Sequence, residues 1–394
     1  MGFAFFLGAV LVTGLNAQQP TGSYRGVLDL AGGPLRFSLT LNADTSSRIC
    51  NGAGSCGRIS PPRSVRDTLF IAIPDYAASI IAVSSGDSLL GFYRNVGNRG
   101  PRVIPFRASP GRWPIEPAPA SLTGSWNATF TQDGRTSRRV FEFRNTSQGL
   151  EGTVISNTGD YGNFWGRAEA DSFSIGHFDG SFVYMLTGRL DGDTLRGLFH
   201  AGLRTQTAWT AVRSRGEPWL KPPTELTTAD TSEVFHFTFA DPDGKIWTER
   251  DALFQGKVVL VDIFGSWCPT CHDAAPVLAA LYDKYHSRGL EIVGLAYEVS
   301  GDPVVDSKQI RLYRQKFKIQ FPLLLAGIND TEAAAATLPQ LRGFVSFPTS
   351  IFLGRNGKIR LIHAGFYGPA MEVAHRRLIA DFEKEIELLL NESH

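Results

Sequence analysis

A buried strand that runs directly into a cysteine pair is the feature that most constrains the fold of this chain. Residues 258–264 (VVLVDIF) form an apolar, β-branched run, which is typical of a strand buried on both faces. Gly265 and Ser266 interrupt the run, and Cys268 and Cys271 follow, just before a helical pattern. This order places one sulfur at a helix N-terminus, where unpaired N–H groups and the helix dipole favour the thiolate. Because the thiolate attacks disulfides, the motif indicates redox chemistry.

The length and charge of the chain narrow its function class. The chain has 394 residues, enough for two or three domains, and a formal net charge of +1. Nucleic-acid-binding proteins usually carry a basic excess, so this balance argues against that function. The 41 glycines, together with many Phe, Thr and Ser residues, indicate that much of the chain is strand and turn.

Residues 1–17 are predicted to be a signal peptide. The weakly polar run from Phe3 to Leu15 is too short to span a bilayer comfortably and fits a secretory core, with cleavage expected after Ala17. A buried N-terminal strand is the alternative. Export would place the protein in the periplasm or another extracytoplasmic compartment, where disulfides persist, and we expect no transmembrane anchor in the mature chain.

Two stretches of the N-terminal half resemble each other. Gly86–Phe92 matches Gly192–Leu198, which gives a repeat of about a hundred residues. Short strands with turn signals at intervals of about 8–12 residues are typical of antiparallel meanders closed as a small barrel or sandwich. We therefore predict a first β module over residues 18–108 and a second over residues 121–215.

Two proline-rich segments, 109–120 and 216–232, are predicted to be linkers. Residues 233–394 then alternate strand and helix patterns, including helices over residues 306–317 and 371–390. An Asn356–Gly357 pair predicts a hairpin near the end of this region. The order predicts an α/β domain whose mixed central sheet has helices on both faces.

No catalytic constellation is evident in the β modules. His177 and His200 lie in strand patterns without an evident partner, and we interpret them as structural or surface residues. Cys50 and Cys56 bracket a glycine-rich loop and could close a small structural disulfide, with two free thiols as the alternative. Four tryptophans are interpreted mainly as core residues, with a ligand groove as the alternative: Trp113, Trp126, Trp165 and Trp209.

Several motifs of the C-terminal region together carry a family resemblance. Trp267–Cys271 follows the buried strand, Pro276 lies within the helix, and Phe347–Thr349 and Gly357–Ile359 mark the hairpin. Over residues 233–394 the chain resembles the thioredoxin fold, and within it the TlpA/ResA-like exported thiol-disulfide oxidoreductases. The resemblance implies protein substrates with disulfides or thiols, a membrane-bound thiol electron donor, and no metal or organic cofactor.

The resemblance also implies a role for individual residues. Cys268 is expected to be the exposed nucleophile and Cys271 the buried resolving thiol. A cis peptide bond before Pro348 would bring the Phe347 backbone beside Cys268, where an extended substrate segment can add as a strand. Asp262, six residues before Cys268, is expected to lie buried with a raised pKa and to take the proton of Cys271 through water.

Flanking residues complete the predicted site. We expect four of them to contact the substrate: Trp267, Pro269, Phe347 and Thr349. His272 is interpreted as a solvated helix residue, and the alternative for Asp262 is an ion pair with a lysine such as Lys257. Many ResA-like proteins carry a Glu three residues after the second cysteine. This chain has Ala274 there, which puts in question any specificity that depends on that acid.

These observations predict an exported protein thiol-disulfide oxidoreductase that works as a reductase. One alternative is a binding protein whose β modules recognise a glycan, a lipid or a protein. A less favoured alternative is a peroxiredoxin-like peroxidase. The peroxiredoxin nucleophile normally follows Pro-x-x-x-Thr-x-x-Cys, and Gly265 occupies the threonine position here.

Overall fold

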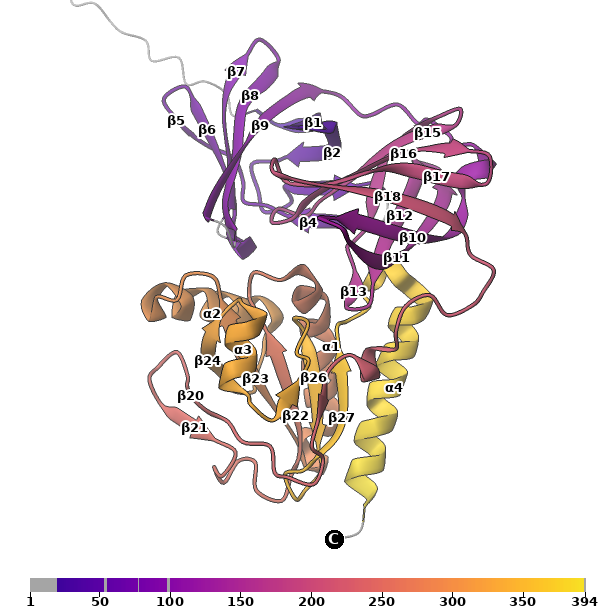
Figure 1. Cartoon of the computed structure of the whole chain (residues 1–394). Helices are drawn as coiled ribbons and strands as arrows, with labels where there is room; N and C mark the ends of the chain where they lie inside the picture. Colours follow the sequence, from indigo (N-terminus) through magenta and orange to yellow (C-terminus); the bar gives the residue numbers. More distant parts are fainter. Residues whose placement is uncertain (1–19, 53–54, 77, 98–99, 393–394) are drawn as a thin grey trace, which may run out of the picture.

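The computed structural model describes residues 20–52, 55–76, 78–97 and 100–392. The predicted signal peptide, residues 1–17, lies outside these residues. Figure 1 shows an N-terminal region built of strands, stacked against a C-terminal α/β domain. Within the part of the chain that the structure describes, no helix has both the length and the apolar character needed to cross a membrane.

The first β module is an antiparallel sheet whose strands follow the order β4-β3-β2-β1-β9-β8-β7-β6-β5. Along β2, Leu35, Phe37 and Leu39 point to the core and alternate with more exposed residues, as expected for a strand with one buried face. Among the described residues no pairing joins β4 to β5, so the sheet is a half-barrel. Its strands are β1 Gly22–Leu30, β2 Gly33–Leu41, β3 Arg48–Asn51, β4 Ser55–Arg58, β5 Arg63–Val65, β6 Thr68–Ile73, β7 Ala78–Ser85, β8 Ser88–Gly97 and β9 Gly100–Pro110.

The second β module closes. Its strands follow the order β11-β10-β18-β17-β16-β15-β14-β12-β13, and an additional pairing between β11 and β12 joins the two ends into a barrel. The predicted fold class of antiparallel meanders is therefore confirmed, with one module closed and one open. The strands are β10 Gly124–Gln132, β11 Arg135–Thr146, β12 Gly149–Ser156, β13 Gly159–Asp160, β14 Phe164–Glu169, β15 Ser172–Phe178, β16 Val183–Asp191, β17 Thr194–Ala201 and β18 Thr205–Arg213.

The C-terminal domain contains a mixed sheet in the order β21-β20-β24-β23-β22-β26-β27. The central strand β22 runs parallel to β23 and antiparallel to β26, which is the mixed sheet that the sequence predicts. A separate pair joins β19 to β25. The strands are β19 Thr228–Ala229, β20 Thr238–Ala240, β21 Ile246–Thr248, β22 Val258–Phe264, β23 Leu290–Glu298, β24 Leu323–Ile328, β25 Leu341–Arg342, β26 Thr349–Leu353 and β27 Ile359–Ala364. The helices are α1 Pro269–Tyr285, α2 Pro303–Phe317, α3 Thr331–Thr337 and α4 Glu372–Asn391.

Both faces of this sheet are covered, which explains why β22 is apolar except at Asp262. Leu260 and Phe264 pack into one core with side chains of α1, α2 and α4. Val261 and Ile263, which point the other way, pack into a second core with residues of α3. Because every residue of β22 is buried, the strand fixes the start of α1 firmly against the sheet.

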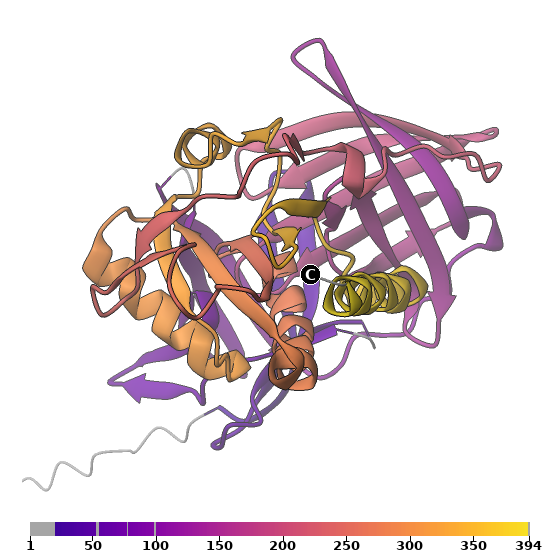
Figure 2. The ribbon, with the colours of Figure 1, turned by 90° about the horizontal axis from the view of Figure 1, so that it is seen from below.

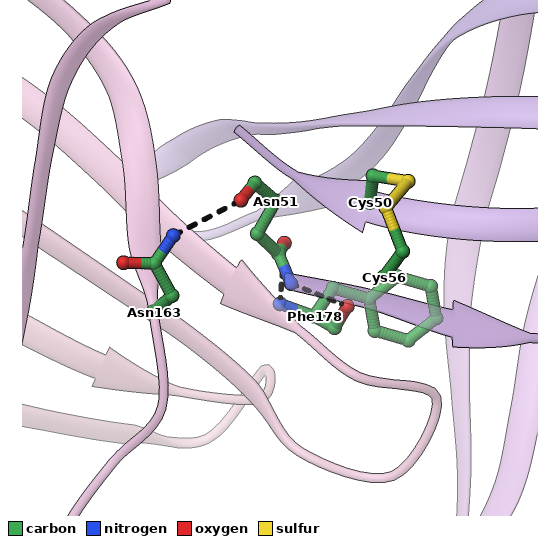
Figure 3. Close-up of a disulfide and its surroundings, with 5 residues drawn as sticks. All are labelled: Cys50, Asn51, Cys56, Asn163 and Phe178. Carbon is green, nitrogen blue, oxygen red and sulfur yellow. Dashed lines mark hydrogen bonds between the residues drawn. A yellow bond between two sulfur atoms is a disulfide. The ribbon is translucent and has the colours of Figure 1, made fainter. Parts of the chain in front are cut away.

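The two β modules share a core. Phe178, Val183 and Met185 of the second module pack into the apolar cluster of the first. Asn51 of β3 joins them by hydrogen bonds: its side chain donates to the Phe178 carbonyl and accepts from the Phe178 N–H, each over 3.0 Å. The Asn163 side chain donates to the Asn51 carbonyl over 3.1 Å (Figure 3).

Replacing Asn51 with alanine is expected to lower the free energy of unfolding by about 3 kcal/mol. The substitution leaves the Phe178 N–H and carbonyl buried without partners, and each unpaired group costs about 1–3 kcal/mol. Urea unfolding of the full chain measures the change. Asn391→Ala, at the exposed end of α4, is the control and should shift the same free energy by less than about 0.5 kcal/mol. Similar losses in both variants would contradict the bridging role of Asn51.

The β modules touch the C-terminal domain directly. Gly159 of β13 forms a parallel bridge with Phe366, and the Gly368 N–H donates to Asp160 Oδ2 over 2.6 Å. Gly159 has φ +125°, and a Cβ there would lie 2.3 Å from the Phe366 carbonyl oxygen, so only glycine allows this approach. The view from below in Figure 2 shows the C-terminal domain lying across the β modules.

Candidate functional site

Hydrogen bonds to the end of β23 fix the loop between β22 and α1. Glu298 accepts hydrogen bonds from the Ser266 N–H over 2.8 Å and from the Ser266 hydroxyl over 2.6 Å. The indole of Trp267 donates to the Tyr297 carbonyl over 2.7 Å. Burial raises the pKa of Glu298 to about 7, against the opposing effect of the Ser266 donors. These contacts fix the residues that precede the cysteine pair.

Cys268 is the N-cap of α1, and Pro269 is the first residue of the helix. The Cys271 N–H donates to Cys268 Sγ over 3.4 Å, as expected where a helix N-terminus stabilises a thiolate. Thr270 Oγ1 lies 3.2 Å from the same sulfur. The sequence resemblance predicted an exposed nucleophile, but Cys268 is only 4% exposed. The prediction was wrong on this point because Thr270, Cys271 and the Phe347 carbonyl contact the sulfur, and the β modules line the cavity in front of it.

Cys271 and Asp262 lie beneath Cys268. Both cysteines are free thiols in this structure, and Cys271 is fully buried. Burial, with the nearby Cys268 and Asp262, raises the pKa of the Cys271 thiol. Asp262 is 4% exposed, its Oδ1 has no hydrogen-bond partner, and burial raises its pKa to about 7. The predicted burial and raised pKa of Asp262 are present, and no ion pair with Lys257 occurs among the described residues.

The loop before β26 brings a backbone carbonyl to the sulfur. The Phe347–Pro348 peptide bond is cis, and the Cys268 thiol donates to the Phe347 carbonyl over 3.5 Å. The Thr349 hydroxyl, fully buried, donates to the Ser346 carbonyl over 2.8 Å. Phe347 also packs edge-to-face on Trp267, with ring centroids 5.8 Å apart. The structure therefore brings together the predicted substrate-contacting residues around Cys268. Thr349 is buried, however, and its hydrogen bond stabilises the loop.

His272 is not the solvated residue that the sequence predicted. It is 9% exposed, and its Nε2 lies 2.6 Å from the Ser266 carbonyl. Lys316 Nζ of α2 lies 3.1 Å from its other ring nitrogen, and Tyr76 of the first β module stacks on the ring with centroids 4.7 Å apart. The Tyr76 contact comes from a distant module, so local helix periodicity could not predict it.

An interdomain cavity of about 580 Å³ lies over Cys268. From the C-terminal domain its lining includes Trp267, Cys268, Pro269, Asp273 and Phe347. From the two β modules its lining includes Arg58, Tyr76, Asp160, His177, Asp179 and Tyr184. Cys56 also lines the cavity, and the structure joins it to Cys50 in a disulfide across the β3–β4 hairpin.

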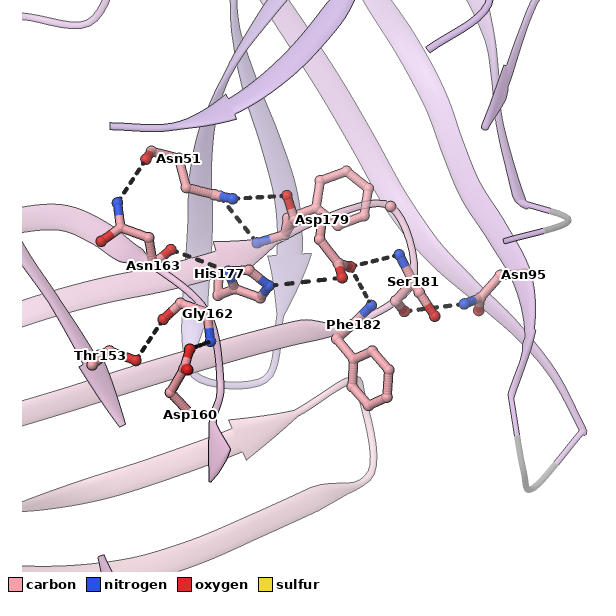
Figure 4. A network of polar contacts seen from close by, with 12 residues as sticks. Asn51, Asn95, Thr153, Asp160, Gly162, Asn163, His177, Asp179, Ser181 and Phe182 are labelled. Carbon is pink, nitrogen blue, oxygen red and sulfur yellow. Dashed lines mark hydrogen bonds and ion pairs between the residues drawn. The ribbon is translucent and has the colours of Figure 1, made fainter. Parts of the chain in front are cut away.

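A buried polar network forms the wall that the second β module contributes (Figure 4). His177 Nδ1 lies 3.1 Å from the Asn163 carbonyl, and its Nε2 lies 3.9 Å from Asp179. Burial opposes the charge on His177, but the hydrogen bond and charge of Asp179 raise its pKa overall. The sequence predicted no partner for His177, and this expectation is corrected: its partners lie in the loop between β13 and β14 and in the β15–β16 turn.

Two further acids line the same cavity. Asp160 accepts hydrogen bonds from the N–H groups of Gly162 and Gly368, and burial raises its pKa. Burial, followed by repulsion from Asp160 and Asp179, raises the pKa of Asp273 to about 8. Asp160 follows a Thr158–Gly159 turn in the sequence, which indicates a hairpin but no chemistry. Only the tertiary contact with α1 places it near Asp273.

Comparison with known proteins supports the family resemblance of the C-terminal region. The model of the AhpC/TSA family matches residues 231–362. A ResA thiol-disulfide oxidoreductase of Bacillus thuringiensis subsp. konkukian is 25% identical over 127 residues, 32% of this chain and 65% of that protein. The ResA protein of Geobacillus thermodenitrificans is 27% identical over 129 residues, 33% of this chain and 66% of that protein. A chloroplastic peroxiredoxin Q of Suaeda salsa is 28% identical over 138 residues, 35% of this chain and 60% of that protein. The match to the first of these relatives spans 65% of its length.

Solved structures that match about two fifths of the chain carry related descriptions. A thioredoxin-family thiol:disulfide interchange protein of Chlorobium tepidum TLS is 22% identical, covering 40% of this chain and 95% of its own, with a TM-score of 0.31. The thioredoxin domain of a Bacteroides vulgatus thiol-disulfide oxidoreductase is 20% identical, covering 39% of this chain and 99% of its own, with a TM-score of 0.29.

Proposed function

We propose that this chain, whose C-terminal domain has the thioredoxin fold and resembles the thiol-disulfide oxidoreductases, is an exported oxidoreductase that reduces disulfides. One observation carries the proposal. Cys268 Sγ caps α1 and accepts a hydrogen bond from the Cys271 N–H, so a nucleophilic sulfur and a second free thiol lie within one helical turn.

The reaction begins when the Cys268 thiolate attacks a substrate disulfide. One substrate sulfur joins Cys268 in a mixed disulfide, and the other leaves as a thiolate that takes a proton. Asp262 then accepts the Cys271 proton through water, and Cys271 attacks Cys268 Sγ. This attack breaks the mixed disulfide and releases the second substrate sulfur as a thiolate, which takes a proton. The products are a Cys268–Cys271 disulfide and a fully reduced substrate, which has gained two electrons and two protons. A dithiol donor, expected to be membrane-bound, returns the enzyme to its reduced form.

The reduction potential of the Cys268–Cys271 pair tests the reducing direction. Thiol trapping across a dithiothreitol series measures it on the full chain, with the Cys50→Ser/Cys56→Ser double variant as a control that removes the other cysteines. We expect a value near roughly −270 mV or lower, in the range of thioredoxin. A value near roughly −120 mV would make the protein an oxidant that forms disulfides. Failure to form the disulfide at all would overturn the enzyme assignment.

Peroxide reduction is the second candidate function. The match to the AhpC/TSA family model and to a peroxiredoxin Q favours it, as does the burial of Cys268. Against it, Gly265 occupies the position of the threonine that normally precedes the peroxiredoxin nucleophile. Hydrogen peroxide consumption by the dithiothreitol-reduced protein, with Cys268→Ser as the blank, separates the two. Rapid consumption that Cys268→Ser abolishes would favour the peroxidase.

A binding role for the β modules remains compatible with the enzyme. Arg58, Asp160 and His177 of these modules line the cavity over Cys268. We therefore propose that the modules bind the substrate that reacts at Cys268. A separate glycan, lipid or protein receptor would instead keep its ligand when Cys268 is replaced and lose it when the modules are altered.

A further inference from the structure

We propose that the substrate is a low-molecular-weight zwitterionic disulfide, of the size and charge of a disulfide-linked amino acid or short peptide, and not a folded protein. This inference rests on the proposed function and names its substrate class. It departs from the protein substrates that the sequence resemblance implies.

The position of Cys268 in a cavity favours a small substrate. Cys268 is 4% exposed, and its sulfur faces a cavity of about 580 Å³ bounded by both β modules and by the C-terminal domain. This volume lies within the range of about 300–1,000 Å³ that small-molecule sites occupy. Phe347, whose backbone an extended protein segment would pair with, lies inside the same cavity. The β modules and the C-terminal domain thus leave a space of small-molecule size in front of Cys268, which favours a small disulfide over a folded protein.

The wall of this cavity carries both acidic and basic side chains. Both signs face the cavity from separate elements, whereas a substrate recognised by shape alone would need an apolar lining. The acidic side chains come from β13, the β15–β16 turn and α1, and the basic side chains come from β4, β11 and α2. The charged lining residues are Asp160, Asp179, Asp273, Arg58, Arg144 and Lys316. Asp179 is paired with His177 and Arg144 with Glu151. A zwitterion would therefore offer its ammonium group to Asp160 and Asp273, and its carboxylate to Arg58 and Lys316.

The electrostatics of the two acids favour an ammonium group between them. Burial comes first, and repulsion from Asp160 second, among the causes that raise the pKa of Asp273 to about 8. A bound cation lets both carboxylates ionise together, since it offsets their repulsion. Binding of such a group should therefore release a proton from Asp273 near neutral pH.

The wall is also held rigidly. The N–H groups of Gly162 and Gly368 fix the Asp160 carboxylate over 2.9 and 2.6 Å. Those of Ser181 and Phe182 fix Asp179 over 2.8 and 2.7 Å (Figure 4). A site whose charged groups are already ordered loses little entropy when it binds a small ligand.

Single-turnover kinetics with the reduced full chain at pH 7 test the proposal. The probes are cystine as the zwitterion, hydroxyethyl disulfide as the neutral small disulfide, and insulin as the folded protein disulfide. Each is mixed with the protein, and the formation of the Cys268–Cys271 disulfide is followed by acid quench and alkylation. We expect cystine to react at least about tenfold faster than either of the others. Equal rates for cystine and hydroxyethyl disulfide, or a faster reaction with insulin, would overturn the proposal.

Asp273→Asn is the matched variant, with Asp193→Asn in the exposed β16–β17 turn as the control. The Asp273 variant should lose about tenfold in rate with cystine and little with hydroxyethyl disulfide, while the control changes neither. An equal loss with both probes would mean that Asp273 is structural and would overturn its role as a substrate contact.

A second measurement needs no variant. Iodoacetamide should alkylate Cys268 of the reduced protein readily, whereas a maleimide carrying a long polyethylene glycol chain should react at least about tenfold more slowly, after normalisation to the two rates on free cysteine. Equal normalised rates would show that the cavity is open to large molecules. Absence of reaction with all three disulfides would instead count against the proposed function itself, so the two failures are distinguishable.

Discussion

Replacing Cys268 with serine is expected to abolish disulfide reduction, with a loss of more than about a thousandfold in rate. A serine hydroxyl at this position stays protonated at neutral pH and cannot form the disulfide-exchange intermediate, so the chemistry loses its nucleophile. The substitution removes one sulfur from a helix N-cap, and serine is itself a good N-cap, so the fold should persist. The rate of substrate reduction by the full chain measures the effect.

Cys271→Ser gives the complementary result and completes this test. Cys268 can still attack, but the mixed disulfide cannot be resolved, so a covalent adduct with the substrate should accumulate and be visible by mass spectrometry. The Cys50→Ser/Cys56→Ser double variant should keep most of the activity, because its pair is already closed in the structure. Full activity of Cys271→Ser without an adduct would contradict the two-cysteine mechanism.

Asp262→Asn is expected to slow the resolution step by about a hundredfold, which is the lower end of what a positioned general base contributes. Since the pKa of Asp262 is about 7, the wild-type rate of this step should rise with pH and level off above about 7. The variant should lose this inflection. Single-turnover release of substrate from the mixed disulfide, measured from pH 5 to 9, tests both statements.

Glu298→Gln is the matched control for Asp262, since burial raises the pKa of Glu298 to about 7 as well. Glu298 accepts hydrogen bonds from Ser266, whereas Asp262 is the acid that acts on the Cys271 thiol, so the Glu298 variant should keep the inflection. If Glu298→Gln removed the inflection and Asp262→Asn kept it, the assignment of the base would be wrong.

Asp262→Asn should also raise the free energy of unfolding of the protein at alkaline pH. The carboxyl has a pKa near 3.8 when unfolded and about 7 when folded, so between these values only the folded state holds the proton. The free energy of unfolding therefore falls as pH rises through this window, and the penalty persists above it. Asparagine carries no charge to bury, so the gain at pH 8 should approach roughly 4 kcal/mol and should vanish near pH 3. Urea unfolding at the two pH values measures it.

The sequence predicted the parts of the site whose signals are local. The apolar run of β22, the cysteine spacing and the Pro348 motif lie close together in the chain, and they identified the redox pair. The start of a helix was harder to predict where the N-cap residue determines it. The helix predicted to begin at residue 306 begins at Pro303, because the Asp302 side chain accepts hydrogen bonds from Val304 and Val305.

The cover over the site could not be predicted, because it depends on contacts between distant segments. Tyr76 and His272 are far apart in sequence, and neither carries a local signal for their stacking. Gly159 reads as an ordinary turn residue, although its missing Cβ is what lets β13 reach Phe366. The same limit explains why Cys268 was expected to be exposed and His177 to lack a partner.

The shared core of the two β modules has a consequence for how this protein can evolve. Repeated units that fold separately can be gained, lost or transferred by recombination, because each copy keeps its own interior. Here Phe178, Val183 and Met185 of the second β module complete the interior of the first. Removing either module would expose apolar surface in the remaining one. The two β modules are therefore expected to be inherited as a unit. A substitution in the core that they share must be matched by a compensating substitution in the other module.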